Sequence, residues 1–148
     1  MQITPLEAIE LAMYLKTVKG FTNQKIRLLM EDTVTEFRLD QVNYTHGNKI
    51  VRKTYTCPFY KNCQEGCSIA PEYKPYGCLA FNPTTPLVKK GTNCRSDINL
   101  LEERELQHKK EEKLLNEKIT KELNLNFEKL SIPMAILEII KAEENLRP

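Results

Sequence analysis

The chain has 148 residues, a length typical of one domain that can bury a core without covalent cross-links. Its 22 basic and 20 acidic residues nearly cancel, which does not favour a protein that binds nucleic acid through the phosphates. The chain has none of the roughly twenty-residue apolar runs that a membrane helix needs, and its opening residues lack the pattern of a signal peptide. We therefore expect a soluble protein of the cytoplasm, with no membrane partner.

The first predicted helix covers about residues 5–18. Thr4 and Glu7 have the spacing of a capping box, and Pro5 between them suits the first helical position. Gly20 should end the helix, because glycine readily adopts the backbone conformation found after a helix C-terminus.

A second helix and a short hairpin are expected to follow. Thr22 or Asn23 can cap a helix over about 23–36, where apolar residues recur at helical spacing. Residues of about 37–56 then alternate around a His-Gly-Asn tripeptide at 46–48, which can form a tight turn. An irregular hairpin would bring the chain to the first cysteine.

All five cysteines lie in the segment 57–95, which we expect to be an irregular loop. Its prolines and glycines interrupt helices and strands, so something other than a backbone ladder should order it. A bound metal ion could supply that order. The interrupting residues are Pro58, Gly66, Pro71, Pro75, Gly77, Pro83 and Pro86.

The C-terminal part, residues 96–148, is predicted to be a helical extension. Ser96 or Asp97 can cap a helix that runs to about residue 123, with a wholly polar and therefore solvated section at 107–113. A last helix should begin at Ser131, with Pro133 in its first turn. An apolar stripe on that helix would pack on the domain or on a partner protein. The stripe consists of Ile132, Ile136, Ile139 and Ile140.

These elements predict a mainly α fold, α+β at most. Residues 1–95 would form a cysteine-cluster domain, with the metal loop at its end, and 96–148 would pack on that domain or on another protein.

The cysteines are candidate metal ligands, because a clustered, odd-numbered set in a reducing compartment favours a metal site over disulfides. Thiolates select zinc or iron-sulfur clusters, and four of them suit either a tetrahedral zinc ion or a four-iron cluster. Zinc sites usually contain two tightly spaced cysteine pairs, and here just Cys63 and Cys67 have such spacing. The spacing therefore slightly favours an iron-sulfur cluster over zinc. The candidates are Cys57, Cys63, Cys67, Cys78 and Cys94.

Other interpretations of the cysteines remain open. They could be buried as small apolar side chains, or form disulfides with one thiol left over. Lys74, Lys89, Lys90 and Arg95 could instead lower thiol pKa values and create a redox switch. His46 and His108 have no ligand-like spacing to a cysteine and are interpreted as turn or surface residues.

Aromatic residues accompany the cysteines. They could shield a metal from water, or stack on single-stranded nucleic acid. These residues are Tyr55, Phe59, Tyr60, Tyr73, Tyr76 and Phe81.

The cysteine segment resembles the YkgJ-type cysteine-cluster family of zinc- or iron-chelating proteins. The similar residues are Cys57-Pro58-Phe59, Gly66-Cys67-Ser68-Ile69 and Lys74-Pro75-Tyr76-Gly77-Cys78-Leu79-Ala80-Phe81, with Ile3-Thr4-Pro5 and Glu7 at the opening. Together they cover roughly residues 3–95. The resemblance implies a metal-binding site built on thiolates.

This chain also departs from that family's pattern. The family's first cysteine group would precede Ile3, and the sequence begins at Met1 without it, through loss or through a shortened start. Cys63 is extra to the pattern and could replace a missing ligand. Cys94 lies where some relatives have a late cysteine.

Three functions follow as hypotheses. The first is a metal-binding protein with a structural, redox or iron-handling role. The second is a subunit or remnant of a protein-modifying enzyme, because the family includes relatives of a lysine N-methylase. The third is a zinc-stabilised adaptor for protein or nucleic acid. No Gly-rich phosphate loop or nucleophile–base set supports catalysis, so we predict no catalytic residue.

Overall fold

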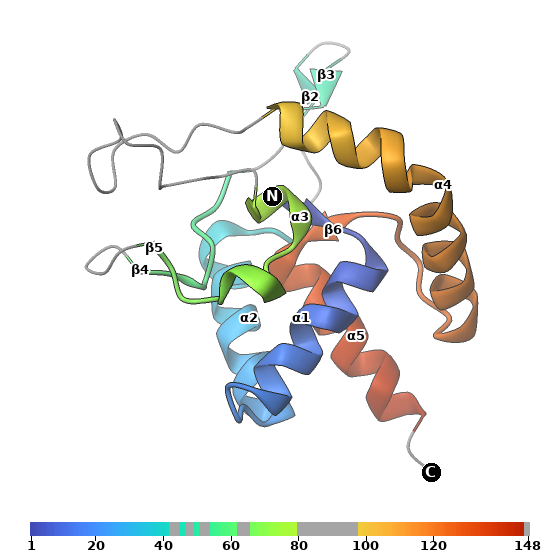
Figure 1. The fold of residues 1–148 in the computed structure, drawn as a ribbon. Coiled ribbons are helices and arrows are strands. Elements are labelled where there is room, and N and C mark those ends of the chain that lie inside the picture. The colour runs from blue at the N-terminus through green and yellow to red at the C-terminus, as the bar shows by residue number, and fades with distance from the viewer. Residues whose placement is uncertain (42–44, 47–48, 51–53, 62–65, 80–97, 147–148) are drawn as a thin grey trace.

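A computed structural model describes residues 1–41, 45–46, 49–50, 54–61, 66–79 and 98–146. Within these ranges the chain is mostly helical, with five α-helices and three two-stranded antiparallel sheets (Figure 1). The predicted mainly α fold class is therefore confirmed.

Helix α1 (Pro5–Thr17) begins with the predicted capping box. The Glu7 backbone N–H donates to Thr4 Oγ1 at 3.4 Å, and the Thr4 N–H donates to Glu7 Oε2 at 2.9 Å. Two of the backbone donors at the helix start are thus satisfied by side chains of the same turn. Gly20 has a φ of +65° beyond the helix end, a conformation that glycine adopts without steric cost.

Helix α2 (Asn23–Phe37) is capped by Thr22, whose Oγ1 accepts from the Lys25 backbone N–H at 3.2 Å. Ile26 and Met30 are fully buried on one face of α2. The predicted extents of both helices are confirmed to within a residue or so.

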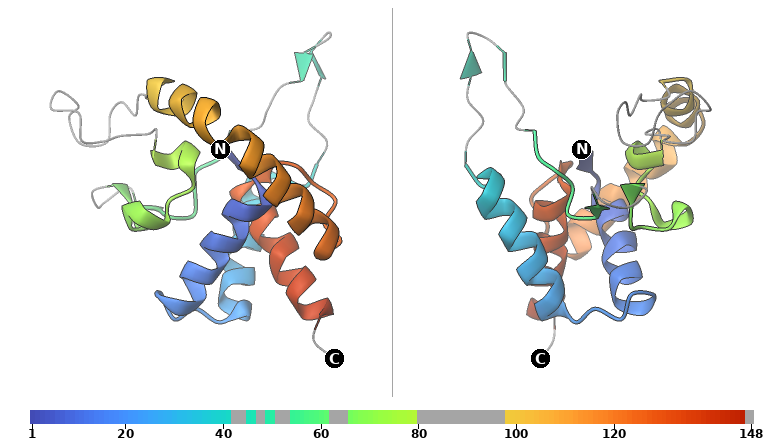
Figure 2. Two further views of the ribbon diagram at one scale, coloured as in Figure 1. Left: turned by 45° about the vertical axis from the view of Figure 1, so that its right-hand side comes forward. Right: turned by 90° about the vertical axis from the view of Figure 1, so that its left-hand side faces the viewer.

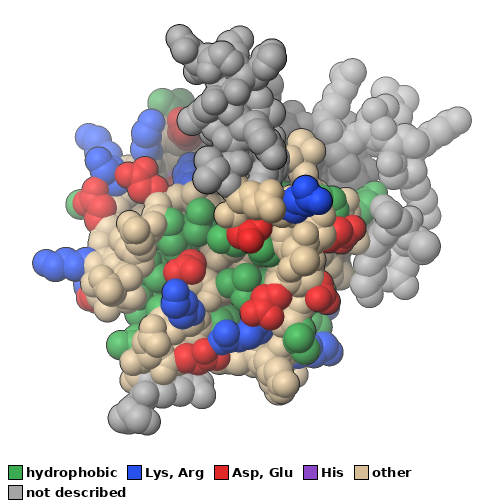
Figure 3. Space-filling model, turned by 180° about the vertical axis from the view of Figure 1, so that it is seen from behind, with side chains coloured by type: hydrophobic (Ala, Val, Ile, Leu, Met, Phe, Trp, Pro, Cys, Tyr) green, Lys and Arg blue, Asp and Glu red, His purple; other side chains and the backbone are tan. Residues whose placement is uncertain are grey.

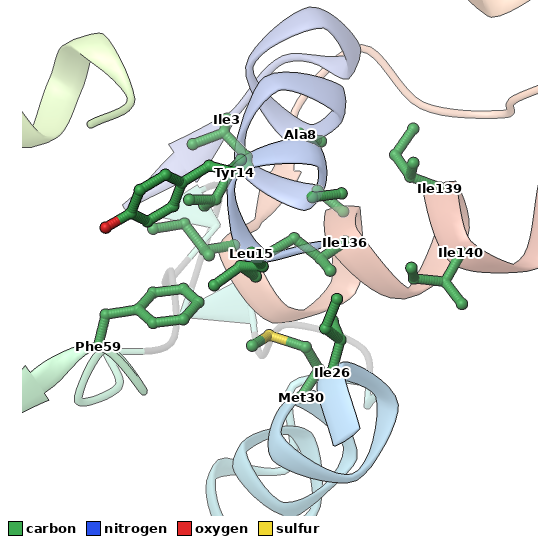
Figure 4. Close-up of a cluster of buried hydrophobic side chains, with 14 of the residues drawn as sticks. Ile3, Ala8, Tyr14, Leu15, Ile26, Met30, Phe59, Ile136, Ile139 and Ile140 are labelled. Carbon is green, nitrogen blue, oxygen red and sulfur yellow. The ribbon is translucent and has the colours of Figure 1, made fainter. Parts of the chain in front are cut away.

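Helix α5 (Ile132–Asn145) packs against both α1 and α2 and supplies much of the core (Figure 2). All four residues of its predicted apolar stripe are at most 1 % exposed. Its Ile136 lies near Leu15 of α1, and both face the side chains that α2 contributes (Figure 4). Strand β6 (Leu130–Ser131) precedes α5 directly and pairs with β1 (Gln2–Ile3), so the start of the chain lies beside the start of the last helix.

Helix α4 (Ile98–Glu122) is the longest helix of the described residues and contacts α1 along its outer side. The predicted helix is confirmed, although its two candidate caps lie outside the described residues. Its polar middle section is largely exposed, with Glu112 half-buried. No helix in the described ranges is both long and apolar enough to cross a membrane.

Two hairpins connect α2 to the C-terminal helices. The first joins β2 (Thr45–His46) and β3 (Lys49–Ile50) in antiparallel register, as predicted, although each strand has just two residues.

The second hairpin corrects a prediction. Strands β4 (Tyr60–Lys61) and β5 (Gly66–Cys67) form a backbone ladder inside the cysteine segment, where we expected none. A short 3₁₀ turn, η1 (Pro71–Tyr73), and the helix α3 (Tyr76–Leu79) follow. The ladder is possible because prolines fall at or just before the starts of elements, where the missing N–H breaks no ladder hydrogen bond.

The surface is mixed in charge. On the face shown in Figure 3, Lys and Arg side chains alternate with Asp and Glu side chains. Basic and acidic side chains are thus both present on this face, as the nearly equal numbers in the sequence imply. Apolar side chains are visible between them.

Candidate metal centre

Three of the five predicted ligands lie within electrostatic reach of one another although they come from three different local structures. Cys57 begins the turn that leads into β4, Cys67 ends β5, and Cys78 lies in α3. All three are free thiols, partly buried and packed against the hydrophobic core. Negative charge on Cys67 would raise the pKa values of both Cys57 and Cys78, which places the thiol groups within electrostatic reach of one another.

The turn after Cys57 directs backbone donors toward its sulfur. The Tyr60 N–H donates to the Cys57 carbonyl at 2.9 Å, which reverses the chain into β4. Burial raises the pKa of the Cys57 thiol, while hydrogen bonds from the Phe59 and Tyr60 backbone N–H groups lower it. Such N–H donors stabilise a thiolate once a metal has displaced its proton.

Burial, with a smaller contribution from charge on Cys57, Cys67 and Glu7, raises the pKa of the Cys78 thiol to about 12. The thiol is therefore neutral at physiological pH when no metal is bound. A ligating cysteine must lose this proton, so metal binding at Cys78 would release a proton and would strengthen as pH rises.

This raised pKa predicts slow alkylation of Cys78. In the reduced, metal-free protein at pH 8, we expect iodoacetamide to modify Cys78 about a thousandfold more slowly than in the urea-unfolded chain, because only the thiolate reacts. Mass spectrometry of peptides sampled over time would give the two rates. The rate in the folded protein should still rise with pH above 9; a plateau near pH 9 would contradict a raised pKa.

Glu7 positions α3, and with it Cys78. One carboxylate oxygen, Oε2, serves the capping box, while Oε1 accepts from the Tyr76 backbone N–H at 2.9 Å. Tyr76 is the first residue of α3, two positions before the cysteine. The same carboxylate that starts α1 thus also holds the start of α3.

Arg104 of α4 completes this arrangement. Its guanidinium lies 3.4 Å from Glu7 Oε1, pairs with Glu112, and stacks 4.1 Å from the centre of the Tyr76 ring. Glu7 is 8 % exposed, and a carboxylate so buried needs both the cation and the hydrogen bonds. Sequence reasoning missed this network: Glu7 was assigned only a capping role, and nothing local marks Arg104.

Tyr55 connects the approach to Cys57 with both ends of the fold. Its hydroxyl donates to the Met1 carbonyl at 2.9 Å and accepts from the Ile132 N–H at 3.0 Å. Burial raises its pKa, so it stays a neutral donor. Gly77 allows the Met1 side chain to cross α3, because a Cβ there would lie 2.5 Å from Met1 Sδ.

The predicted aromatic patch is divided among separate contacts in the described residues. Phe59 is 4 % exposed and inserts into the core (Figure 4), Tyr73 stacks on Tyr14 with ring centres 4.4 Å apart, and Tyr76 lies beneath Arg104. Phe81 lies outside the described residues. These rings pack the cysteine segment onto α1 and α4.

Two predicted ligands, Cys63 and Cys94, lie outside the described residues. His108 is exposed on α4. Among the residues that the structure describes, no three His, Cys, Asp or Glu side chains are arranged as a ready ligand set. The donor chemistry of Cys57, Cys67 and Cys78 suits a soft metal, but the described thiols are neighbours rather than a closed site.

In comparisons with known proteins, no protein-family model, no curated protein and no solved structure matches the chain.

Proposed function

We propose that this chain is a metal-binding cysteine-cluster protein, in which thiolates hold an iron-sulfur cluster or a zinc ion. The observation that carries the proposal is that the Cys57, Cys67 and Cys78 thiols, from three separate local structures, lie within electrostatic reach of one another. A fourth thiolate would come from Cys63, in the connection between β4 and β5, or from Cys94. The proposal includes membership of the YkgJ-type family, on the residues that resemble it.

Free thiols alone do not account for this arrangement. Cys57 lies in a loop, Cys67 in a two-residue strand and Cys78 in a four-residue helix, and such short segments have little cooperative stability of their own. One ion bound by all of them would fix the β4 turn, β5 and α3 together, and its binding energy would add to folding. When bound, zinc would supply structural cross-linking, and a cluster would supply one-electron redox chemistry or iron handling.

The reducing cytoplasm is the compartment proposed for this protein, because thiols stay free there. If the C-terminal helices contact another protein, α4 would make that contact, because the apolar stripe of α5 is buried in the core. On α4, Leu106 is 87 % and Leu114 is 67 % exposed.

The test is anaerobic purification followed by metal analysis and a visible spectrum. A brown protein with broad charge-transfer absorbance would indicate a cluster, and a colourless protein with stoichiometric zinc would indicate a structural ion. We expect Cys57→Ser, Cys67→Ser and Cys78→Ser each to lose more metal affinity than the roughly 10- to 100-fold that a supporting contact contributes.

Cys63→Ser and Cys94→Ser form a matched pair, and one of the two should retain the metal. The far-UV circular dichroism spectrum of each variant would show that helices α1, α2 and α5 remain folded. A folded protein that carries no metal after anaerobic purification, with all five thiols open to titration, would refute the proposal.

A further inference from the structure

A groove opens between the helical hairpin of α1 and α2 and the residues that flank the β4–β5 hairpin. Its volume is about 470 Å³, within the range of small-molecule sites. The α1 side contributes Tyr14, Leu15 and Lys19, and the segment around the cysteines contributes Pro58, Phe59, Ser68 and Ile69. Residues far apart in sequence thus form one concave surface.

The floor of the groove is apolar and belongs to the rigid core. Leu15 is 1 %, Ile69 is 3 % and Phe59 is 4 % exposed, so the three side chains are held by packing on their other sides. Phe21 and Leu29 add half-buried apolar walls. An apolar ligand could cover this surface without displacing a hydrogen-bonded group.

The rim is polar and carries two cations. Lys19 and Lys25 are both exposed, and neither forms an ion pair within the described part of the chain. The Lys19 ammonium group lies 5.7 Å from the centre of the Tyr14 ring, and that of Lys25 lies 3.9 Å from the centre of the Phe21 ring. Asp32 lines the groove two helical turns beyond Lys25, about 10 Å along α2. Positive charge is therefore concentrated at one end of an apolar surface.

We propose that this groove binds a small amphipathic carboxylate, with its apolar chain on the floor and its carboxylate between Lys19 and Lys25. Burial of the chain against Phe21 and Leu29, over the floor of Leu15, Phe59 and Ile69, supplies affinity, and the two ammonium groups select an anion and set its direction. Asp32 repels a carboxylate placed at the opposite end. No cysteine side chain lines the site.

The test is a titration of the reduced protein with decanoate, in which isothermal calorimetry measures the affinity and methyl NMR shifts locate the ligand. We expect decanoate to bind saturably and more tightly than decanol, and decylammonium to bind more weakly than decanol. Decanoate should shift the NMR signals of the methyl groups of Leu15, Leu29 and Ile69. Equal affinity for all three amphiphiles, or no saturable binding of decanoate below its micelle concentration, would overturn the proposal.

Charge variants locate the carboxylate. Lys19→Gln and Lys25→Gln should each weaken decanoate binding about two- to fivefold, the range expected for one exposed ion pair, while leaving decanol binding unchanged. Lys129→Gln removes an exposed lysine outside the groove and should have no effect. An equal loss in Lys129→Gln would show a non-specific charge effect and would refute this site.

Discussion

Replacing Glu7 by alanine is expected to lower the free energy of unfolding by about 3 kcal/mol, as is typical when one partner of a buried ion pair is removed. The change would leave the Thr4 and Tyr76 N–H groups without their acceptor and would remove one carboxylate from Arg104. Urea denaturation followed by circular dichroism would measure the loss.

Glu7→Ala should also alter the cysteine site, because Glu7 holds the first residue of α3. We expect faster alkylation of Cys78 in the folded variant at pH 8, since a displaced α3 exposes the thiol to water and lowers its pKa. Glu36→Ala is the matched control: Glu36 is an exposed carboxylate near the end of α2, and its replacement should change stability by less than about 0.5 kcal/mol. Equal effects of the two variants would contradict the positioning role of Glu7.

Ile136→Ala is expected to destabilise the protein by about 3 to 4 kcal/mol, within the range for large-to-small changes in a core. Ile136 is 0 % exposed on the helix that packs against both α1 and α2, so the cavity would form where three helices meet. Because small proteins have a total stability of about 5–15 kcal/mol, the midpoint of urea unfolding should fall sharply.

Leu114→Ala removes a side chain of similar size from α4, where it is 67 % exposed. We expect its unfolding free energy to stay within about 0.5 kcal/mol of the unmodified protein. A loss at Leu114 as large as that at Ile136 would mean that the core is not centred on α5.

Helix positions could be predicted because their signals are local. The Thr4–Glu7 capping box lies within one turn, and the isoleucine stripe of α5 repeats within three turns, so neither depends on the rest of the fold. Whether that stripe would pack on its own chain or on a partner was left open. The tertiary structure buries it against α1 and α2.

Predictions were least accurate in the cysteine segment. Proline and glycine indicated an irregular loop, yet β4 and β5 pair there in antiparallel register. Two-residue strands carry too little periodicity to be recognised from sequence. The pattern of cysteines identified candidate ligands, but their spacing in the sequence could not show how closely the thiols approach one another.

By itself, the sequence determined the four longer helices, the caps of α1 and α2 and the position of the cysteines along the chain. Only the tertiary structure decided which distant groups meet: Glu7 with the Tyr76 N–H, 69 residues apart, and with Arg104, 97 residues apart. It also decided that Phe59 and Ile69 would line a groove with Lys19 and Lys25. The physical reason is that caps and periodicity act over a few residues, whereas these contacts join elements that are distant in the sequence and exist only in the packed fold.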